Sequence, residues 1–243
     1  MTETVYRTIV IVDVEGSSTR NNVQLGELRS ALYRVLHDSL PSAEVVTPPR
    51  DGDRGDGVML IFTLPVLDVL DGIIGDLFAA VRRYNNDVGP LDWMRVRVAV
   101  HEGYVGRDEN GPFSDALTAT FRMNDARTLK QTLKNAARAD GALAVSDTVY
   151  QNVIRHGYRA TVTPAEYRDA LIATTEGSVR IWIRVPGYPN PPIPTDKSKT
   201  VVPVDDHTDR PKHARDDVNA YNLIVGDVRA RTIIGRDNVG GQV

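Results

Sequence analysis

The sequence contains no cysteine, and this absence excludes disulfide bonds, thiolate catalysis and cysteine-based zinc sites. It also lacks an excess of basic residues: the formal net charge is -3, which gives no support for a nucleic-acid-binding protein. The most apolar helical stretch, residues 66–81, is interrupted by three aspartates, too many for a membrane span. The first residues lack the basic and apolar regions of a signal peptide. We therefore expect a cytoplasmic protein that binds neither nucleic acid nor a membrane.

The spacing of apolar residues predicts alternating strands and helices over roughly three quarters of the chain. Runs of β-branched residues are typical of strands, whereas apolar residues three and four positions apart are typical of helices. We predict strands at residues 5–14, 58–64, 94–101, 142–145 and 179–185, and helices at residues 23–39, 66–85, 114–139 and 146–155. The helix at 114–139 is expected in two pieces, divided around residues 124–125. This alternation favours an α/β or α+β sandwich with helices packed on a mixed sheet.

The composition changes after Gly187, and this change predicts the domain organisation. Five prolines cluster between residues 186 and 194, and a stretch rich in charged residues follows. Such a composition is typical of an extended, solvated linker. We therefore predict a folded domain at residues 1–187, a linker at residues 188–219 and a short β-prone tail at residues 220–243.

Two aspartates, Asp13 and Asp56, stand at the ends of runs that are predicted to be strands. Strand ends are rigid, so both carboxylates can be aimed at one point. Two carboxylates in one cleft repel each other unless a cation lies between them, which predicts a site for Mg²⁺ or Mn²⁺. The alternative is that each aspartate only forms a turn or a helix cap. Gly55 and Gly57 favour the metal site, because glycine lets a backbone turn tightly and approach a ligand.

The segment that joins the first strand to the first helix could hold an anion. It contains Glu15, Gly16, Ser17, Ser18 and Thr19. Free backbone N–H groups at a helix N-terminus bind anions well, so this segment is a candidate cradle for a triphosphate. The alternative is an ordinary helix cap by one of the three hydroxyl residues.

A single arginine, Arg122, lies within an otherwise apolar stretch of a predicted helix. Its guanidinium could neutralise negative charge that develops at a phosphate. The alternative is a structural ion pair with Asp115 or Asp125, because a buried arginine requires an anion as a partner.

Three blocks, in this order, resemble the class III nucleotide cyclases. They are residues 10–17, residues 54–59, and residues 97–103 leading to the helix of Arg122. The resemblance covers about residues 5–187 and implies an α+β fold, with a mixed or antiparallel sheet between helices. It implies that Asp13 and Asp56 bind two divalent ions, helped by the backbone carbonyl of Val14. It also implies that Arg122 stabilises the transition state.

The sequence departs from that family at two positions. The helix usually carries an asparagine four residues before the arginine, to orient the ribose, and here that residue is Thr118. Its hydroxyl can still form a hydrogen bond. Adenylyl cyclases carry a lysine four residues before the second aspartate, to select adenine, and here that residue is Gly52. The purine-selecting pattern is therefore absent.

Residues 53–57 and 180–187 resemble a narrower group, the bacterial pyrimidine cyclases of the Pycsar antiphage system. This resemblance implies that the protein converts UTP, or alternatively CTP, to a cyclic nucleotide that activates a separate effector and leads to abortive infection. The candidate residues for the base pocket are Arg50, Asp53, Arg54 and Arg97. In the family each active site is shared between subunits, so a head-to-tail homodimer is implied.

The tail has a separate interpretation. Residues 233–240 resemble short amyloid-signalling motifs of some bacterial immune proteins, which implies an effector partner recruited by strand stacking. The alternatives are a frayed tail or a strand that docks on the domain. For the whole chain, the alternative to an active cyclase is a catalytically silent cyclase-homology domain that senses a ligand or acts as an adaptor.

Overall fold

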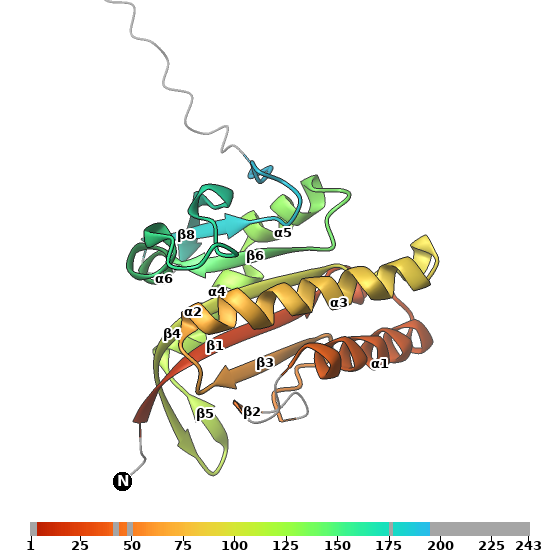
Figure 1. Cartoon of the computed structure of the whole chain (residues 1–243). Helices are drawn as coiled ribbons and strands as arrows, with labels where there is room; N and C mark the ends of the chain where they lie inside the picture. Colours follow the sequence, from red (N-terminus) through yellow and green to blue (C-terminus); the bar gives the residue numbers. More distant parts are fainter. Residues whose placement is uncertain (1–3, 41–43, 48–50, 175–176, 195–243) are drawn as a thin grey trace, which may run out of the picture. The chain divides into compact units, whose positions relative to one another are not determined.

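One mixed sheet organises the part of the chain that the computed structural model describes, which is residues 4–40, 44–47, 51–174 and 177–194 (Figure 1). Its strand order is β2-β3-β1-β4-β6-β8-β7, and β5 pairs with β4. The strands are β1 (Thr4–Val14), β2 (Val45–Thr47), β3 (Gly57–Phe62), β4 (Val96–Asp108), β5 (Gly111–Phe113), β6 (Gly141–Ser146), β7 (Arg168–Thr174) and β8 (Gly177–Arg184). β4 and β6 are parallel, and the other neighbouring strands are antiparallel.

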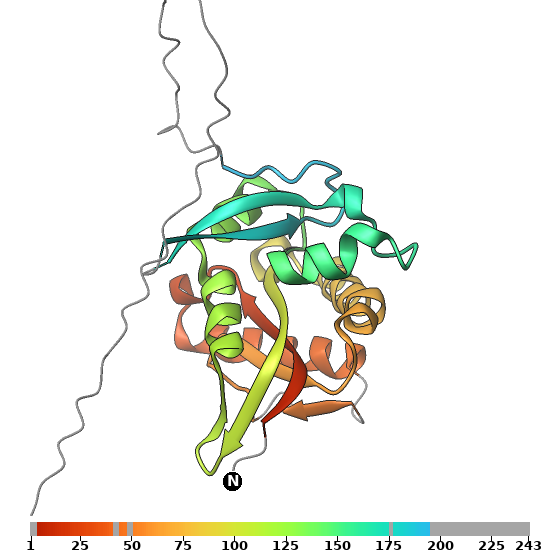
Figure 2. The ribbon, with the colours of Figure 1, turned by 90° about the vertical axis from the view of Figure 1, so that its left-hand side faces the viewer.

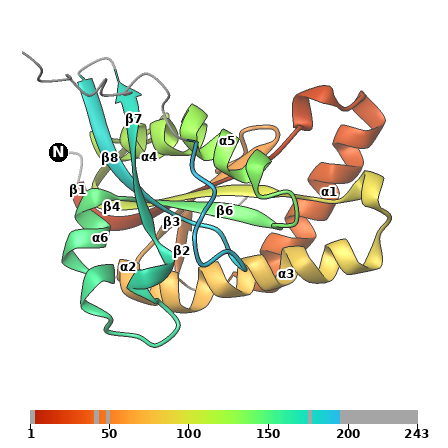
Figure 3. The same ribbon diagram turned by 90° about the horizontal axis from the view of Figure 1, so that it is seen from above.

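Helices cover both faces of this sheet. They are α1 (Asn22–Ser39), α2 (Val66–Asp68), α3 (Ile74–Asp87), α4 (Asp115–Asp125), α5 (Arg127–Asn135) and α6 (Asp147–Asn152). Buried residues of α1 and α3 pack with Val10 and Val12 of β1, whereas α4 packs with Ile9 and Ile11 on the opposite face. Figure 3 shows the sheet between α3 on one side and α4 and α5 on the other. Since β1 is buried on both faces, its apolar run is continuous instead of alternating.

The predicted fold class is confirmed, and the predicted strands and helices are all present. The predicted break near residues 124–125 is also confirmed, because α4 ends at Asp125 and α5 begins at Arg127. The predicted helix at 66–85 contains a π-helical turn at Val69–Ile73, between α2 and α3. The sequence prediction lacked β2, β5 and β7. The first two have only three residues each, and the apolar residues of β7 do not alternate with polar ones.

β4 is longer than the prediction, which ended it at residue 101. It pairs along the whole of β1, from Thr4 opposite Gly106 to Val14 opposite Val96, and then turns into β5. Figure 2 shows the β4–β5 hairpin beside the N-terminal end of β1. Gly103 and Gly106 weaken the strand pattern in the sequence, but close packing requires them. A Cβ at Gly103 would lie 2.6 Å from the Cβ of Ala116, and one at Gly106 would lie 2.8 Å from the ring of Phe113.

The first residues of the predicted linker pack against the domain. The side chain of Asn135 donates to the carbonyl of Pro192 at 3.0 Å, and Arg168 donates to Asn190 at 2.6 Å. The rest of the predicted linker and the predicted tail lie outside the described residues. Within the described ranges, no helix is both long enough and apolar enough to cross a membrane.

Candidate active site

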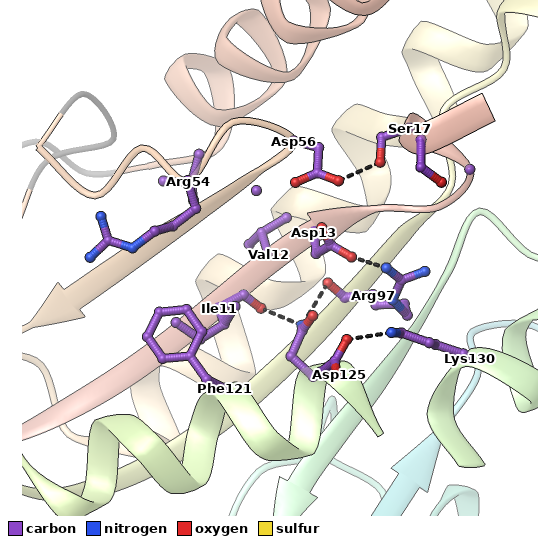
Figure 4. A pocket seen from close by; sticks show the side chains of 15 residues that line it. Ile11, Val12, Asp13, Ser17, Arg54, Asp56, Arg97, Phe121, Asp125 and Lys130 are labelled. Atoms are coloured by element: carbon purple, nitrogen blue, oxygen red, sulfur yellow. Dashed lines mark hydrogen bonds and ion pairs between the residues drawn. The ribbon is translucent and has the colours of Figure 1, made fainter. Parts of the chain in front are cut away.

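The ends of β1 and β3 open into a cavity of about 540 Å³ (Figure 4). Strand residues, the loop after β1, the turn before β3, and α4 and α5 all contribute to its wall. The lining residues are Ile11, Val12, Asp13, Gly16, Ser17, Ser18, Arg54, Asp56, Gly57, Val58, Arg97, Phe121, Asn124, Asp125 and Lys130. This set contains three carboxylates and three basic side chains.

The two aspartates lie at this cavity because of strand register. Asp13 of β1 lies opposite Gly57 of β3, so Asp56 immediately precedes the paired position. The backbone N–H of Val14 donates to the carbonyl of Asp56 at 3.1 Å and ties the two strand ends together. A Cβ at Gly57 would lie 2.8 Å from the carbonyl oxygen of Val12, so this close approach requires glycine. The structure thus brings together the two carboxylates that the sequence singled out.

Each of these carboxylates has a polar partner. Asp13 forms an ion pair with Arg97, its neighbour in the β1–β4 register, and Asp56 accepts a hydrogen bond from the hydroxyl of Ser17. The side chains of Asp13 and Arg97 are only 19% and 11% exposed, so solvent screens this pair weakly. Burial lowers the pKa of the Arg97 guanidinium from its ordinary value, and Asp125 opposes this effect. The Nε of Arg97 is buried and has no hydrogen-bond partner among the described residues.

The loop after β1 leaves its serines available to the cavity. Gly16 adopts a left-handed conformation with φ +72°, and Ser17–Thr19 form a single 3₁₀ turn. The N-cap of α1 is Asn21, which forms a capping box with Gln24. The alternative in which Ser17, Ser18 or Thr19 caps this helix is therefore wrong.

Glu15 does not line the cavity. Its carboxylate accepts from Arg95 at 2.8 Å, and the same guanidinium donates to the carbonyls of Leu133, Ala136 and Ala139 near the end of α5. These contacts satisfy carbonyls at a helix C-terminus, which otherwise have no partner. They fasten β4 to α5, and they indicate a structural role for Glu15 in this chain.

Two of the candidate base-pocket residues point in different directions. Arg54 lines the cavity, whereas Asp53 receives two hydrogen bonds from the guanidinium of Arg29 on α1, at 2.9 and 2.5 Å. The Arg29 guanidinium and the N–H of Gly55 hold the pKa of the Asp53 carboxyl well below its usual range. Arg29 was not singled out in the sequence, because its pairing with Asp53 depends on the tertiary contact. Arg50 lies outside the described residues.

Gly52 cannot be replaced without moving the backbone. Its carbonyl accepts from the N–H of Met59 at 2.8 Å, and a Cβ at this position would lie 1.8 Å from the carbonyl oxygen of Met59. Real contacts at that distance do not occur, so any side chain, including a lysine, must displace the turn before β3. Position 52 therefore contributes only backbone atoms.

We expect the substitution Gly52→Ala to lower the free energy of unfolding by about 1–3 kcal/mol, as overpacking usually does. The matched control is Gly26→Ala in α1, where a Cβ meets nothing within 4 Å. That change should raise the free energy of unfolding by about 0.5–1 kcal/mol, because alanine is the better helix former. Urea denaturation of both variants measures the two effects. Unchanged stability of the Gly52 variant would contradict the close contact.

Arg122 and Thr118 do not line the cavity. Both are exposed, and they lie four residues apart on one face of α4. Arg122 has no ion-pair partner in the described part of the chain, and Asp125 pairs with Lys130 instead. The alternative of a structural ion pair between Arg122 and Asp115 or Asp125 is therefore wrong. The residues of α4 that line the cavity are Phe121, Asn124 and Asp125.

Asn124 is a cavity residue that the sequence did not reveal. It is only 4% exposed, and its Nδ2 donates to the carbonyls of Ile11 and Arg97, at 3.1 Å in each case. These two bonds join the end of α4 to β1 and β4. They also fix the orientation of the amide, because rotating it by 180° would place its oxygen against two carbonyl oxygens, which cannot donate a hydrogen bond. The side chain positions the helix that carries Arg122.

The donor atoms at the cavity suit a hard divalent cation. Among the described residues, no group of three or more histidine and acidic side chains could bind a metal ion on its own. Mg²⁺ is commonly bound by one or two carboxylates together with substrate phosphates, and Asp13 and Asp56 supply such a pair of carboxylates. The residues present therefore fit a metal that binds together with a phosphorylated substrate.

No family model and no curated protein matches the sequence. Solved structures do match. The crystal structure of an adenylate/guanylate cyclase/hydrolase from Silicibacter pomeroyi has a TM-score of 0.53 and 20% identity, over 76% of this chain and 99% of that chain. A bacterial light-regulated adenylyl cyclase has a TM-score of 0.46 and 16% identity, over 74% and 90% of the two chains. The similarity to the Silicibacter pomeroyi structure, together with the sheet and helices described above, shows that the chain has the fold of the class III nucleotide cyclases.

Proposed function

We propose that this protein is a nucleotide cyclase that converts UTP to 3′,5′-cyclic UMP and diphosphate. The observation that carries the proposal is the convergence of Asp13 and Asp56 on one cavity beside the loop of Gly16, Ser17 and Ser18. This arrangement lies in a chain with the class III cyclase fold. Two carboxylates and a loop with free backbone N–H groups are what a metal-bound triphosphate requires.

Asp13 and Asp56 would hold two Mg²⁺ or Mn²⁺ ions, with the backbone carbonyl of Val14 as a further ligand. Such ions, when bound, neutralise phosphate charge and make a nearby hydroxyl easier to deprotonate. In cyclisation, the ribose 3′-oxygen bonds to the α-phosphorus while the bond to the bridging oxygen of the diphosphate breaks. The chain's own residues orient the triphosphate: the N–H groups of residues 16–18 bind its oxygens, and the ion pair with Arg97 holds Asp13 in place.

A complete active site requires a second copy of the chain. Arg122 and Thr118 are exposed and lie outside the cavity of their own chain, so they are free to reach the cavity of a partner. In a head-to-tail homodimer, Arg122 would neutralise the charge that develops at the α-phosphate, and the hydroxyl of Thr118 would orient the ribose. Two such sites form in one dimer, because a twofold axis repeats each contact.

Base selection is proposed to favour uracil. Gly52 leaves no room for the lysine that the family resemblance associates with adenine. Arg54 lines the cavity and offers only hydrogen-bond donors. Uracil presents an acceptor at position 4, whereas cytosine presents an amino donor there, so a guanidinium matches uracil better. CTP is the alternative substrate.

The product would act as a second messenger in antiphage defence, where it activates a separate effector. The support for this role is the resemblance of residues 53–57 and 180–187 to the Pycsar cyclases. The effector partner suggested by residues 233–240 belongs to the same proposal. The second candidate function is a catalytically silent ligand-sensing domain, which Thr118 at the asparagine position favours.

The deciding experiment incubates the full chain with ATP, GTP, CTP or UTP and Mn²⁺ and identifies the products by mass spectrometry. We expect cyclic UMP as the main product, and about tenfold less cyclic CMP from CTP. One mismatched hydrogen-bonding group on the base lowers the affinity for the substrate by about that factor. A purine cyclic nucleotide as the main product would refute the base assignment. No cyclic product from any nucleotide, together with measurable nucleotide binding, would favour the silent domain.

A further inference from the structure

A third basic side chain of the cavity, Lys130, has no role in the function proposed above. It projects from α5, and Figure 4 shows it reaching toward Asp125 at the end of α4. In the sequence this lysine is typical of a solvated helix face. In the structure it lines the same cavity as Asp13, Asp56 and Ser17.

Two basic residues of the cavity, Arg97 and Lys130, differ in how firmly they are held. The side chain of Arg97 is 11% exposed and forms an ion pair with Asp13, whose side chain is 19% exposed. Lys130 is 44% exposed, and its partner Asp125 is 81% exposed. Ion pairs between exposed side chains contribute little, because water screens them and both chains lose conformational freedom. Lys130 can therefore leave Asp125 for a stronger anion at low cost.

The charges of the cavity indicate which anion that is. The three lining carboxylates, on Asp13, Asp56 and Asp125, balance the three lining cations, on Arg54, Arg97 and Lys130. Two divalent ions would add four positive charges, which matches the about four negative charges of a fully ionised nucleoside triphosphate. The diphosphate that leaves gains negative charge as its bond to the α-phosphorus breaks. A mobile ammonium at the cavity wall is suited to that charge, since a lysine binds phosphate as a point charge.

We infer that Lys130 binds the terminal phosphates of the nucleoside triphosphate, and the departing diphosphate, by exchanging Asp125 for a phosphate oxygen. The inference rests on the proposed function, because it assigns the triphosphate to this cavity. It adds a phosphate-binding residue that comes from the same chain as Asp13 and Asp56. Asp125 acts as the resting partner of the ammonium and competes with the phosphate for it.

The test is calorimetric binding of inorganic tripolyphosphate to the full chain in the presence of Mn²⁺. We expect Lys130→Ala to weaken binding about tenfold, which is the effect of losing one charge-assisted hydrogen bond. Lys130→Arg should recover most of this loss, because it keeps the charge. Asp125→Asn should tighten binding a few-fold, since it removes both the competing partner and a negative charge from the wall. Lys134→Ala is the matched control, because Lys134 is exposed on the same helix but does not line the cavity.

The inference is overturned if tripolyphosphate binds Lys130→Ala as tightly as it binds the unmodified chain, or if the unmodified chain does not bind it at all. An equal loss in Lys134→Ala would also overturn it, because only the general charge of the helix would then matter. The outcome is separate from that of the proposed function. A chain that cyclises no nucleotide but loses tripolyphosphate affinity with Lys130→Ala refutes the cyclase proposal and leaves the phosphate site standing. A chain that cyclises a nucleotide but binds tripolyphosphate equally well with and without Lys130→Ala supports the cyclase proposal and refutes the phosphate site.

Discussion

The substitution Asp56→Ala is expected to lower the rate of cyclic nucleotide formation by at least about a thousandfold while the protein remains folded. Metal ions stabilise transition-state charge by several kcal/mol, and Asp56 is one of the two carboxylates proposed to hold them. The only hydrogen bond of the Asp56 side chain in the described part of the chain comes from Ser17. Its loss should change the free energy of unfolding by about 1 kcal/mol or less, because Asp56 is partly exposed.

Product formation from UTP with saturating Mn²⁺, followed by mass spectrometry, measures the rate, and urea denaturation measures stability. Asp51→Ala is the matched control, because Asp51 is an exposed aspartate of the same turn that does not line the cavity. It should keep activity within about twofold, since an exposed charge outside the site has little effect. Activity of the Asp56 variant within tenfold of the unmodified chain would rule out the proposed metal site.

Heterodimers that combine Asp56→Ala in one chain with Arg122→Ala in the other are expected to recover about half of the unmodified activity. Each homodimeric variant should be nearly inactive, since an arginine that neutralises transition-state charge contributes a factor of about a thousand or more. In the heterodimer, one site combines both defects, and the other combines an intact Asp56 with an intact Arg122 from the partner. One working site of two gives half the activity.

Two different affinity tags, one on each chain, allow the heterodimer to be purified from co-expressed material. If Arg122 acted within its own chain, neither site of the heterodimer would be intact, and no activity would return. Absence of a purifiable dimer would also contradict the shared site. Arg127→Ala serves as the control for Arg122→Ala, because Arg127 is an exposed arginine just beyond the end of α4. Its loss should leave activity unchanged.

Local patterns in the sequence predicted most of the fold. The continuous β-branched run of β1 and the helical spacing in α1 depend only on neighbouring residues, so both elements were predicted nearly to their observed ends. The far end of β4 was not predicted, because its glycines weaken the strand pattern and are explained only by the packing of Ala116 and Phe113 against them in the folded chain. The short strands β2 and β5 carry too few residues for a pattern.

Residue type and position at strand ends were also sufficient to single out Asp13, Asp56, Ser17 and Ser18. Their partners were not predictable in the same way. Arg97 is 84 positions from Asp13 and meets it only through the register of β1 with β4. Asn124 resembles any polar residue near a helix end until its amide is seen to join the carbonyls of two strands.

The sequence alone determined that this chain forms alternating strands and helices with two aspartates at strand ends, because strand and helix periodicity are local properties. Tertiary structure decided which charged residues share the cavity with those aspartates, because such pairing depends on register and packing between distant segments. In the folded chain, Asp53 pairs with Arg29 and Glu15 pairs with Arg95. Lys130 lies at the cavity wall, and position 52 has no room for a side chain. Tertiary structure also turned Arg122 outward, because the apolar face of α4 packs on the sheet and leaves the arginine on the opposite, exposed face.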